Sequence, residues 1–205
     1  MQRTLYLATK NLGKVNAFNT AFQLPNVQLQ PCPSGLALPP EIHEDYAGNA
    51  MDKAMTVATS TQCPALGDDS GLEILAWDRH PGVQTAPVVA AAGGWPALIA
   101  QLANDAGFAA NPRAEAVCVL ALAFPPSWNL APLLVEERVA GRMILNPRGP
   151  YGFGFDPYYI ADGQAQTLGE NLTPSLTARG RAAQRIQQQL QSMLANNQQL
   201  SQQWG

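Results

Sequence analysis

Two adjacent carboxylates, Asp68 and Asp69, are the residues of this sequence best suited to chemistry. They follow the small apolar run 65–67 and precede Ser70 and Gly71, a pattern that predicts a strand ending in a tight turn. Adjacent carboxylates repel each other, and an isolated buried charge is strongly disfavoured. The pair is therefore expected to face open water or a hard divalent cation such as Mg²⁺. Ordinary turn chemistry is the alternative, because Asp, Ser and Gly are all common in turns.

A second candidate site lies near the amino terminus, where a strand-like run at 4–8 is followed by helical apolar spacing at 15–22. The polar residues of the connecting loop are Thr9, Lys10, Asn11 and Lys14. Amides at a helix start point toward an anion, and lysine adds a mobile positive charge, so this loop suits a phosphate group. The GxxxxGK[ST] spacing of a P-loop is absent, and a solvated strand-to-helix loop explains the pattern equally well.

Bulk properties predict one globular domain over residues 1–205. Hydrophobic residues make up 46% of the chain and charged residues 13%, which argues against disorder. The net charge of −3 and the isoelectric point near 5.3 give no general attraction to nucleic acid. No apolar run reaches membrane-spanning length, and the chain start lacks a signal-peptide core. Three cysteines without paired spacing suggest reduced thiols in a cytoplasmic protein, and Cys118 is expected in a buried strand.

The order of elements indicates an α/β fold, because strand-like and helix-like segments alternate. Strands are expected at 27–29, 72–77, 114–124 and 132–140, and helices at 47–60, 94–102 and 178–203. The glutamine-rich tail carries apolar residues on one helical face, which favours a docked helix over a low-complexity segment.

Six segments, in order, resemble motifs of the inosine triphosphate pyrophosphatase family over roughly residues 4–182. They are A-T-K-N-L-G-K at 8–14, Y-A-G-N-A-M-D-K-A at 46–54, D-D-S-G-L at 68–72, P-G-V-Q-T-A at 81–86, V-A-G-R at 139–142 and G-F-G-F-D-P at 152–157. The resemblance implies an elongated central mixed sheet flanked by helices, with two lobes and an active-site cleft between them. It also implies a homodimer that hydrolyses non-canonical purine nucleoside triphosphates to a monophosphate and pyrophosphate with Mg²⁺ or another divalent cation.

The resemblance also assigns roles to residues of the metal and phosphate half of the site. The phosphate tail would be held by Thr9, Lys10, Asn11 and Lys14. Glu41 would bind the metal, and Asp69 would bind it and act as base for the attacking water, supported by Asp68. Lys53 would reach the phosphates. A solvated loop acid at Glu41 and a surface lysine at Lys53 are the alternatives, since both residue types are usually exposed.

Base recognition is expected at residues 153–156 with Arg179, and Ser70 is expected to bind the substrate. Glycine lets the backbone approach a ligand closely, and an aromatic ring can stack on a purine. The loop residues concerned are Phe153, Gly154, Phe155 and Asp156, of which the last would hold the loop or contact the ligand. An ordinary turn rich in glycine and aromatic residues is the alternative.

Departures from the family pattern concentrate where the base is read. Arg179 is retained, but Ala178 and Thr177 stand in place of a histidine and a serine, and the segment 170–179 contains no lysine. Other departures are Gly48 and Ala17 in place of glutamates and Pro87 in place of an arginine. A lost hydrogen-bonding group reduces discrimination by about 1–3 kcal/mol, so base specificity is in doubt before hydrolysis is.

Three functional interpretations therefore stand. The chain is a metal-dependent nucleoside triphosphate pyrophosphatase, a catalytically impaired nucleotide-binding relative, or a structural protein that keeps only the fold. The two histidines do not support a different chemistry, because neither has a partner at metal-ligand spacing. His80 is expected in a loop, and His43 lies beside acidic residues that could place it near the metal.

Overall fold

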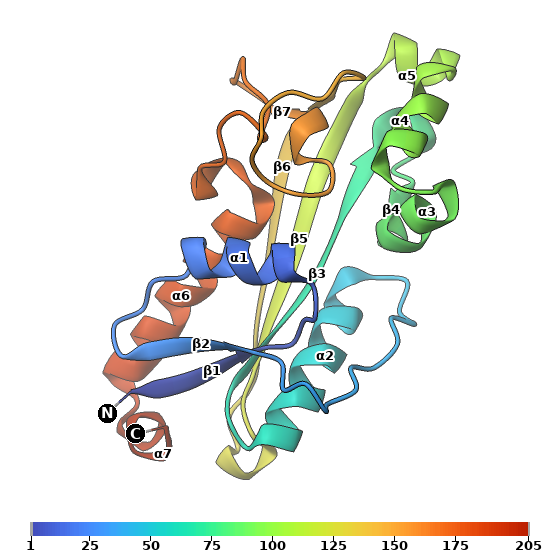
Figure 1. The fold of residues 1–205 in the computed structure, drawn as a ribbon. Helices are drawn as coiled ribbons and strands as arrows, with labels where there is room; N and C mark the ends of the chain where they lie inside the picture. Colours follow the sequence, from blue (N-terminus) through green and yellow to red (C-terminus); the bar gives the residue numbers. More distant parts are fainter. Residues whose placement is uncertain (1, 205) are drawn as a thin grey trace. The chain divides into compact units, whose positions relative to one another are not determined.

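The computed structural model describes residues 2–204, which form two compact units. The first unit contains the chain up to Asp69, residues 119–136 and the chain from residue 180 onward; the second contains residues 70–118 and 137–179. Seven strands form a mixed sheet in the order β2-β1-β3-β5-β6-β7, with β4 paired to β3 (Figure 1). The predicted α/β class, with a mixed sheet flanked by helices, is confirmed. The single domain and the cleft between lobes stay predictions.

In the first unit the sheet is parallel around the start of the strand that contains Asp68 and Asp69. Strand β1 (Arg3–Leu7) pairs in parallel with β2 (Val27–Pro31) and with the start of β3 (Ala65–Ile74), in register Tyr6 to Ala65. The first unit also contains parts of β5 (Arg113–Ala123) and β6 (Leu133–Met143). Strand β5 is buried along almost its whole length, and Cys118, the last residue of β5 in the second unit, is buried within it, as expected.

The helices of the first unit are α1 (Leu12–Ala21), α2 (Tyr46–Thr61), most of α6 (Ala178–Asn196) and α7 (Gln198–Gln203) (Figure 1). The apolar face predicted for the tail is confirmed, because Ile186 and Leu190 are fully buried. The single tail helix is wrong, however. Asn197 ends α6 and caps α7 by accepting the backbone N–H of Leu200 at 3.0 Å. Asparagine favours such caps because its side chain satisfies a backbone donor at the helix start.

The second unit contains β4 (Pro81–Gly82), antiparallel to β3, and β7 (Tyr159–Ala161), antiparallel to β6. Its helices α3 (Thr85–Ala92), α4 (Trp95–Ala103) and α5 (Ala106–Ala110) follow one another in the green segment of Figure 1. Short 3₁₀ turns in the chain are Leu75–Trp77, Pro126–Trp128, Asp156–Tyr158 and Pro174–Leu176. Within residues 2–204 no single helix has the length and hydropathy of a membrane span; α3 and α4 meet that test only when the bent pair is taken together.

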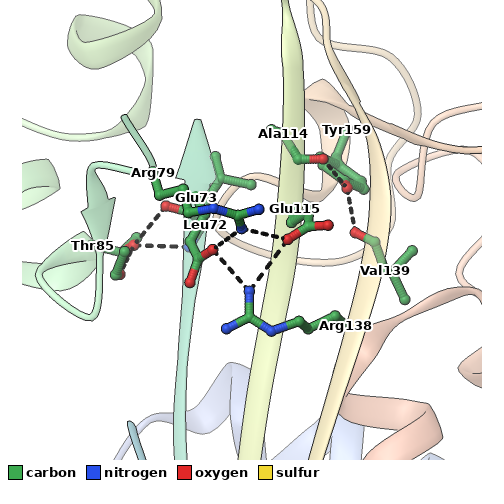
Figure 2. A network of polar contacts seen from close by, with 10 residues as sticks. Leu72, Glu73, Arg79, Thr85, Ala114, Glu115, Arg138, Val139 and Tyr159 are labelled. Carbon is green, nitrogen blue, oxygen red and sulfur yellow. Dashed lines mark hydrogen bonds and ion pairs between the residues drawn. The ribbon is translucent and has the colours of Figure 1, made fainter. Parts of the chain in front are cut away.

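An ion network joins three strands of the second unit (Figure 2). Arg79 and Arg138 each donate to both Glu73 and Glu115, over distances of 2.7–3.2 Å. Glu73 is buried, and hydrogen bonding and charge from Arg79 hold the pKa of Glu115 below its ordinary value. Nearby, the hydroxyl of Tyr159 lies within hydrogen-bond distance of the backbone oxygens of β5 and β6, and its burial raises the pKa of that phenol. These polar contacts fix the register of β3, β5, β6 and β7 in this unit.

The position of the two carboxylates differs from the sequence prediction. Residues 65–74 form one continuous strand, so Asp68 and Asp69 lie in its middle and not on a turn; the strand expected at 72–77 is the end of β3 followed by a 3₁₀ turn. The turn signal failed because each carboxylate has a cationic partner, Lys14 for Asp68 and the buried Lys53 for Asp69. Neighbouring side chains on a strand point to opposite faces. The two acids therefore serve two different lysines, Lys14 and Lys53.

Helix α2 packs on β3 by direct backbone contact at Gly67. A Cβ atom at this position would overlap the carbonyl oxygen of Ala50 and lie 2.9 Å from the backbone nitrogen of Ala54. The facing residues of α2 are small and fully buried, which allows this approach. The close contact brings the polar side chains of α2 within reach of Asp69.

Substituting Gly67→Ala is therefore expected to lower the free energy of unfolding by about 3 kcal/mol, the upper range for overpacking a tightly filled site. Urea unfolding followed by circular dichroism measures this change. Gly35→Ala is the matched control, because no described atom lies within 4 Å of a Cβ there; it should change stability by only about 0.5 kcal/mol. Equal stability of the two variants would contradict the proposed backbone contact.

Candidate functional site

The centre of the first unit's site is Asp69, a carboxylate with 5% of its side chain exposed. Its Oδ1 lies 3.4 Å from the Nζ of Lys53, and its Oδ2 accepts a hydrogen bond from the Nδ2 of Asn49 at 3.1 Å. Asn49 and Lys53 are four residues apart on α2, so both project from the same helix face. Lys53 Nζ also donates to Glu41 Oε1 at 2.7 Å. One buried ammonium thus joins the two carboxylates that the sequence predicts as metal ligands.

Burial and charge act in opposite directions on this pair. Burial raises the pKa of Asp69 above its ordinary value, although Lys53 and the hydrogen bond from Asn49 oppose that shift. Burial lowers the pKa of Lys53, but the surrounding carboxylates outweigh it, and the pKa of Lys53 is raised. Lys53 is therefore a firmly charged, buried cation. The alternative of an ordinary surface lysine is excluded, because only 7% of its side chain is exposed.

Asp68 forms the second half of this charge cluster by pairing with Lys14 of α1. Lys14 is held near the start of α1, where its backbone N–H donates to the Oδ1 of Asn11 at 3.2 Å. Asn11 is thus the cap of α1, and its own N–H donates to Thr9 Oγ1 at 3.1 Å. The predicted strand, loop and helix start are confirmed. Lys10 is exposed in this loop, and the roles of these residues toward phosphate stay predictions.

The donor set of the first unit fits a hard divalent cation. Glu41 and Asp69 offer carboxylate oxygens that already converge on one cationic group, the ammonium of Lys53. Mg²⁺ usually takes one or two protein carboxylates, keeps several waters and uses substrate phosphates for the rest. Within residues 2–204 no group of three or more His, Cys, Asp or Glu side chains could hold a metal ion. A two-carboxylate site of this kind therefore suits Mg²⁺ with a phosphate substrate better than a metal held by protein alone.

The second unit brings together the residues predicted to recognise a base. Arg179 donates from Nη2 to Ser70 Oγ at 2.7 Å, and its guanidinium carbon lies 5.0 Å from the centroid of the Phe153 ring. Asp156 is buried and accepts the backbone N–H of Phe153 at 2.8 Å, so it holds the loop, one of its two expected roles. Burial raises the pKa of Asp156. The adjacent Gly154 has a φ of +67°, which glycine adopts without strain.

Phe155 has a packing role that the sequence does not reveal. Its ring makes edge contacts with Trp95 and Tyr159, with centroids 5.6 Å apart in each case. Of the two aromatic residues predicted to contact a base, Phe153 is therefore the one whose ring face contacts the guanidinium of Arg179. Ala178, which replaces the family histidine, is buried at the start of α6.

Asn49 has no role that the sequence predicts, although it lies in the segment 46–54 that resembles a family motif. Asn49 is 2% exposed and contacts both Asp69 and the backbone of His43. Its spacing of four residues before Lys53 was the available signal. The ring of His43 is directed at Asp52, since its Nε2 lies 2.8 Å from Asp52 Oδ2.

The raised pKa of Asp69 predicts how stability depends on pH in metal-free protein. Above the ordinary carboxyl pKa of about 3.9 and up to the folded value, the folded state binds more protons than the unfolded state. The free energy of unfolding should therefore fall with rising pH in this window, but not in Asp69→Asn. The free energy of unfolding of Asp69→Asn, relative to that of wild type, should therefore rise with pH. Urea titrations in the presence of chelator measure this difference.

Asp162→Asn provides a control of opposite sign. Arg113 lowers the pKa of Asp162 through a hydrogen-bonded ion pair, so wild type should gain stability over this variant as pH rises through the folded pKa. A pH-independent difference between wild type and Asp69→Asn would contradict the burial of an ionisable carboxylate at that site.

Comparison with known proteins finds relatives that match most of the chain. A family model described as the Ham1 family matches residues 5–189. The dITP/XTP pyrophosphatase of Rhodospirillum centenum is 36% identical over 172 residues, covering 82% of this chain and 83% of that protein. The dITP/XTP pyrophosphatase of Deinococcus deserti is 34% identical over 195 residues, covering 90% and 88%.

Solved structures give the same assignment. A Ham1 protein from Coxiella burnetii superposes with a TM-score of 0.78 at 26% identity, covering 94% of this chain and 100% of that one. The Ham1 protein of Staphylococcus aureus has a TM-score of 0.73 at 23% identity, covering 93% and 99%, which supports the fold alone. The resemblance found in the sequence motifs is thereby confirmed: the chain belongs to the Ham1 family.

Proposed function

We propose that this chain is a nucleoside triphosphate pyrophosphatase, which cleaves its substrate to a monophosphate and pyrophosphate with the help of Mg²⁺. The observation that carries the proposal is the convergence of Glu41 and Asp69 on one buried ammonium, with the Asp68–Lys14 pair on the preceding residue of β3. Relatives that are dITP/XTP pyrophosphatases support the reaction class.

The residues of the first unit can supply each part of the hydrolysis. Glu41 and Asp69 would hold Mg²⁺, which when bound neutralises charge on the phosphates. Lys14 and Lys53 would bind phosphate oxygens, and the start of α1 adds backbone N–H groups directed at an anion. Asp69 accepts a proton as a water oxygen bonds to the α-phosphorus, the α–β anhydride bond breaks and pyrophosphate leaves. A raised carboxyl pKa favours that role, because a base works best with a pKa nearer the working pH.

The residues of the second unit would contact the base. The face of Phe153 and the guanidinium of Arg179 offer stacking and hydrogen-bond donation, and Ser70 and Asp156 hold these two groups in place. Ala178 supplies no hydrogen-bonding side chain where the family has a histidine. We therefore expect a base preference that depends on Arg179 and is weaker than in relatives with the full triplet.

Product analysis on a panel of triphosphates tests the reaction. Wild type with Mg²⁺ is offered ITP, XTP, dITP, GTP, ATP and dUTP, and pyrophosphate and phosphate are measured separately. Pyrophosphate should be the product, and hydrolysis in ¹⁸O-water should place the label in the monophosphate. Asp69→Asn should lower kcat by about a hundredfold or more, because a positioned base contributes that much.

Asp162→Asn is the matched control for this loss, since it makes the same chemical change at an exposed ion pair of the second unit. Nucleotide binding by calorimetry without turnover in wild type would select the alternative function, a catalytically impaired nucleotide-binding relative. The departures at Gly48 and Ala178 favour that alternative. Folded protein with neither binding nor turnover would leave only the fold in common with the family.

Replacing the guanidinium tests base recognition separately. Arg179→Lys should lower kcat/KM for ITP and XTP by about 10- to 100-fold, because a lost hydrogen-bonding group costs about 1–3 kcal/mol. The half-saturating Mg²⁺ concentration should not change, since Arg179 is not part of the carboxylate cluster. Competition between ITP and ATP measures the selectivity. An equal loss for all bases would contradict a role in discrimination.

Assembly and location complete the proposal. We expect a cytoplasmic homodimer that acts on free nucleotides, without nucleic-acid or membrane partners. Light scattering coupled to size-exclusion chromatography measures the assembly, and a monomer would contradict this part of the proposal alone.

A further inference from the structure

The imidazole of His43 occupies the space beside Gly48 in helix α2. A Cβ at position 48 would lie 2.5 Å from His43 Cγ and 2.9 Å from both its Cβ and its Cδ2. Because Cβ and Cγ lie on the axis about which the imidazole rotates, rotation of the ring cannot relieve these two contacts. Any side chain at position 48 would push the backbone of His43 away from the helix.

The ring is anchored at its far end by the same helix face. His43 Nε2 lies 2.8 Å from Asp52 Oδ2, and Asp52 is four residues after Gly48. The contact is a half-exposed one, with 39% of the histidine and 47% of the aspartate side chain accessible. The imidazole therefore spans one turn of α2, with Gly48 beneath it and Asp52 beyond it.

The backbone of His43 is bound to α2 by a reciprocal pair of hydrogen bonds. Its N–H donates to Asn49 Oδ1 at 3.0 Å, and Asn49 Nδ2 donates back to its carbonyl oxygen at 3.2 Å. The same Asn49 amide donates to Asp69 Oδ2 at 3.1 Å. Because Glu41 is only two residues before His43, this clasp attaches the segment that carries Glu41 to the helix that positions Asp69.

We propose that His43 and Gly48 form one positioning device, in which the histidine ring seated on the bare helix backbone sets the place of Glu41. The inference rests on the proposed function, since it gives Glu41 its role as a metal ligand. Gly48 stands where the family has a glutamate, and in this chain it is the condition for seating His43. The device acts through packing and hydrogen bonds, and not through a change of protonation.

A double-mutant cycle with half-saturating Mg²⁺ as its readout tests the device. Gly48→Ala should unseat the ring and raise this concentration about tenfold or more, as loss of a group supporting a metal ligand does. His43→Gly should also raise it, because the anchor is lost. In the combined variant H43G/G48A the alanine methyl group has no imidazole ring to contact. The half-saturating Mg²⁺ concentration should therefore be no higher than in His43→Gly alone. Such non-additivity is the signature of direct contact.

Two measurements separate this inference from the proposed function. Mn²⁺ binding without nucleotide, followed by electron paramagnetic resonance, reads the metal site independently of turnover. The KM for ITP at saturating Mg²⁺ should stay within about threefold in all four proteins, whereas the affinity for the metal ion should fall in the variants. General destabilisation of the fold would not change one of these quantities without the other. Gly35→Ala is the control for a glycine substitution in open space.

The outcomes are distinct. Wild type that neither binds Mn²⁺ nor hydrolyses a triphosphate would overturn the proposed function and this inference with it. Suppose that wild type binds Mn²⁺, and that Gly48→Ala either leaves the metal affinity unchanged or lowers it equally in wild type and in His43→Gly. This result would overturn the inference and leave the proposed function standing. Should Gly48→Ala not fold, His43→Gly decides, and an unchanged Mn²⁺ affinity in that folded variant would contradict the device.

Discussion

The backbone contact between α2 and β3 at Gly67 is the constraint on which the first unit's site depends. A Cβ at position 67 would overlap the backbone of α2, so any side chain there would hold the helix farther from β3. With no Cβ at position 67, α2 approaches closely enough for Asn49 and Lys53 to bind Asp69. The same approach buries the charges, which raises the pKa of Asp69 and makes a cationic partner obligatory.

Much of the fold follows from local patterns in the sequence. Apolar runs located β1, β2, β5 and β6, and helical spacing located α1, α2 and α4, with boundaries shifted by only a few residues. The errors arose where a polar pattern was taken by itself. Asp-Asp-Ser-Gly resembles a turn locally, but pairing with lysines distant in the sequence keeps β3 extended through it. The break at Asn197 was missed because no proline or glycine lies near it in the sequence.

The site was predictable in its charged residues and not in its supporting ones. Ordered motifs identified Lys14, Lys53, Asp68 and Asp69, and the structure pairs each acid with a lysine. Spacing cannot reveal that a glycine leaves room for a histidine five residues earlier, because that contact depends on how a loop folds back on its helix. Phe155 was equally hidden, since an aromatic residue beside glycine looks the same whether it stacks on a ligand or on Trp95.

The ion pairs of Lys53 affect how a metal ion and a nucleotide would bind to this site. In the protein alone its ammonium acts as an internal counter-ion for both Glu41 and Asp69, so part of the negative charge of the two carboxylates is offset before any solute binds. A divalent cation held by Glu41 and Asp69, as proposed above, would replace that ammonium, and Lys53 would then need a new anion. A triphosphate supplies one. Metal and nucleotide binding are then thermodynamically linked, each increasing the affinity for the other by the same factor. Such a site would bind a divalent cation alone more weakly than it binds the same cation together with a nucleotide.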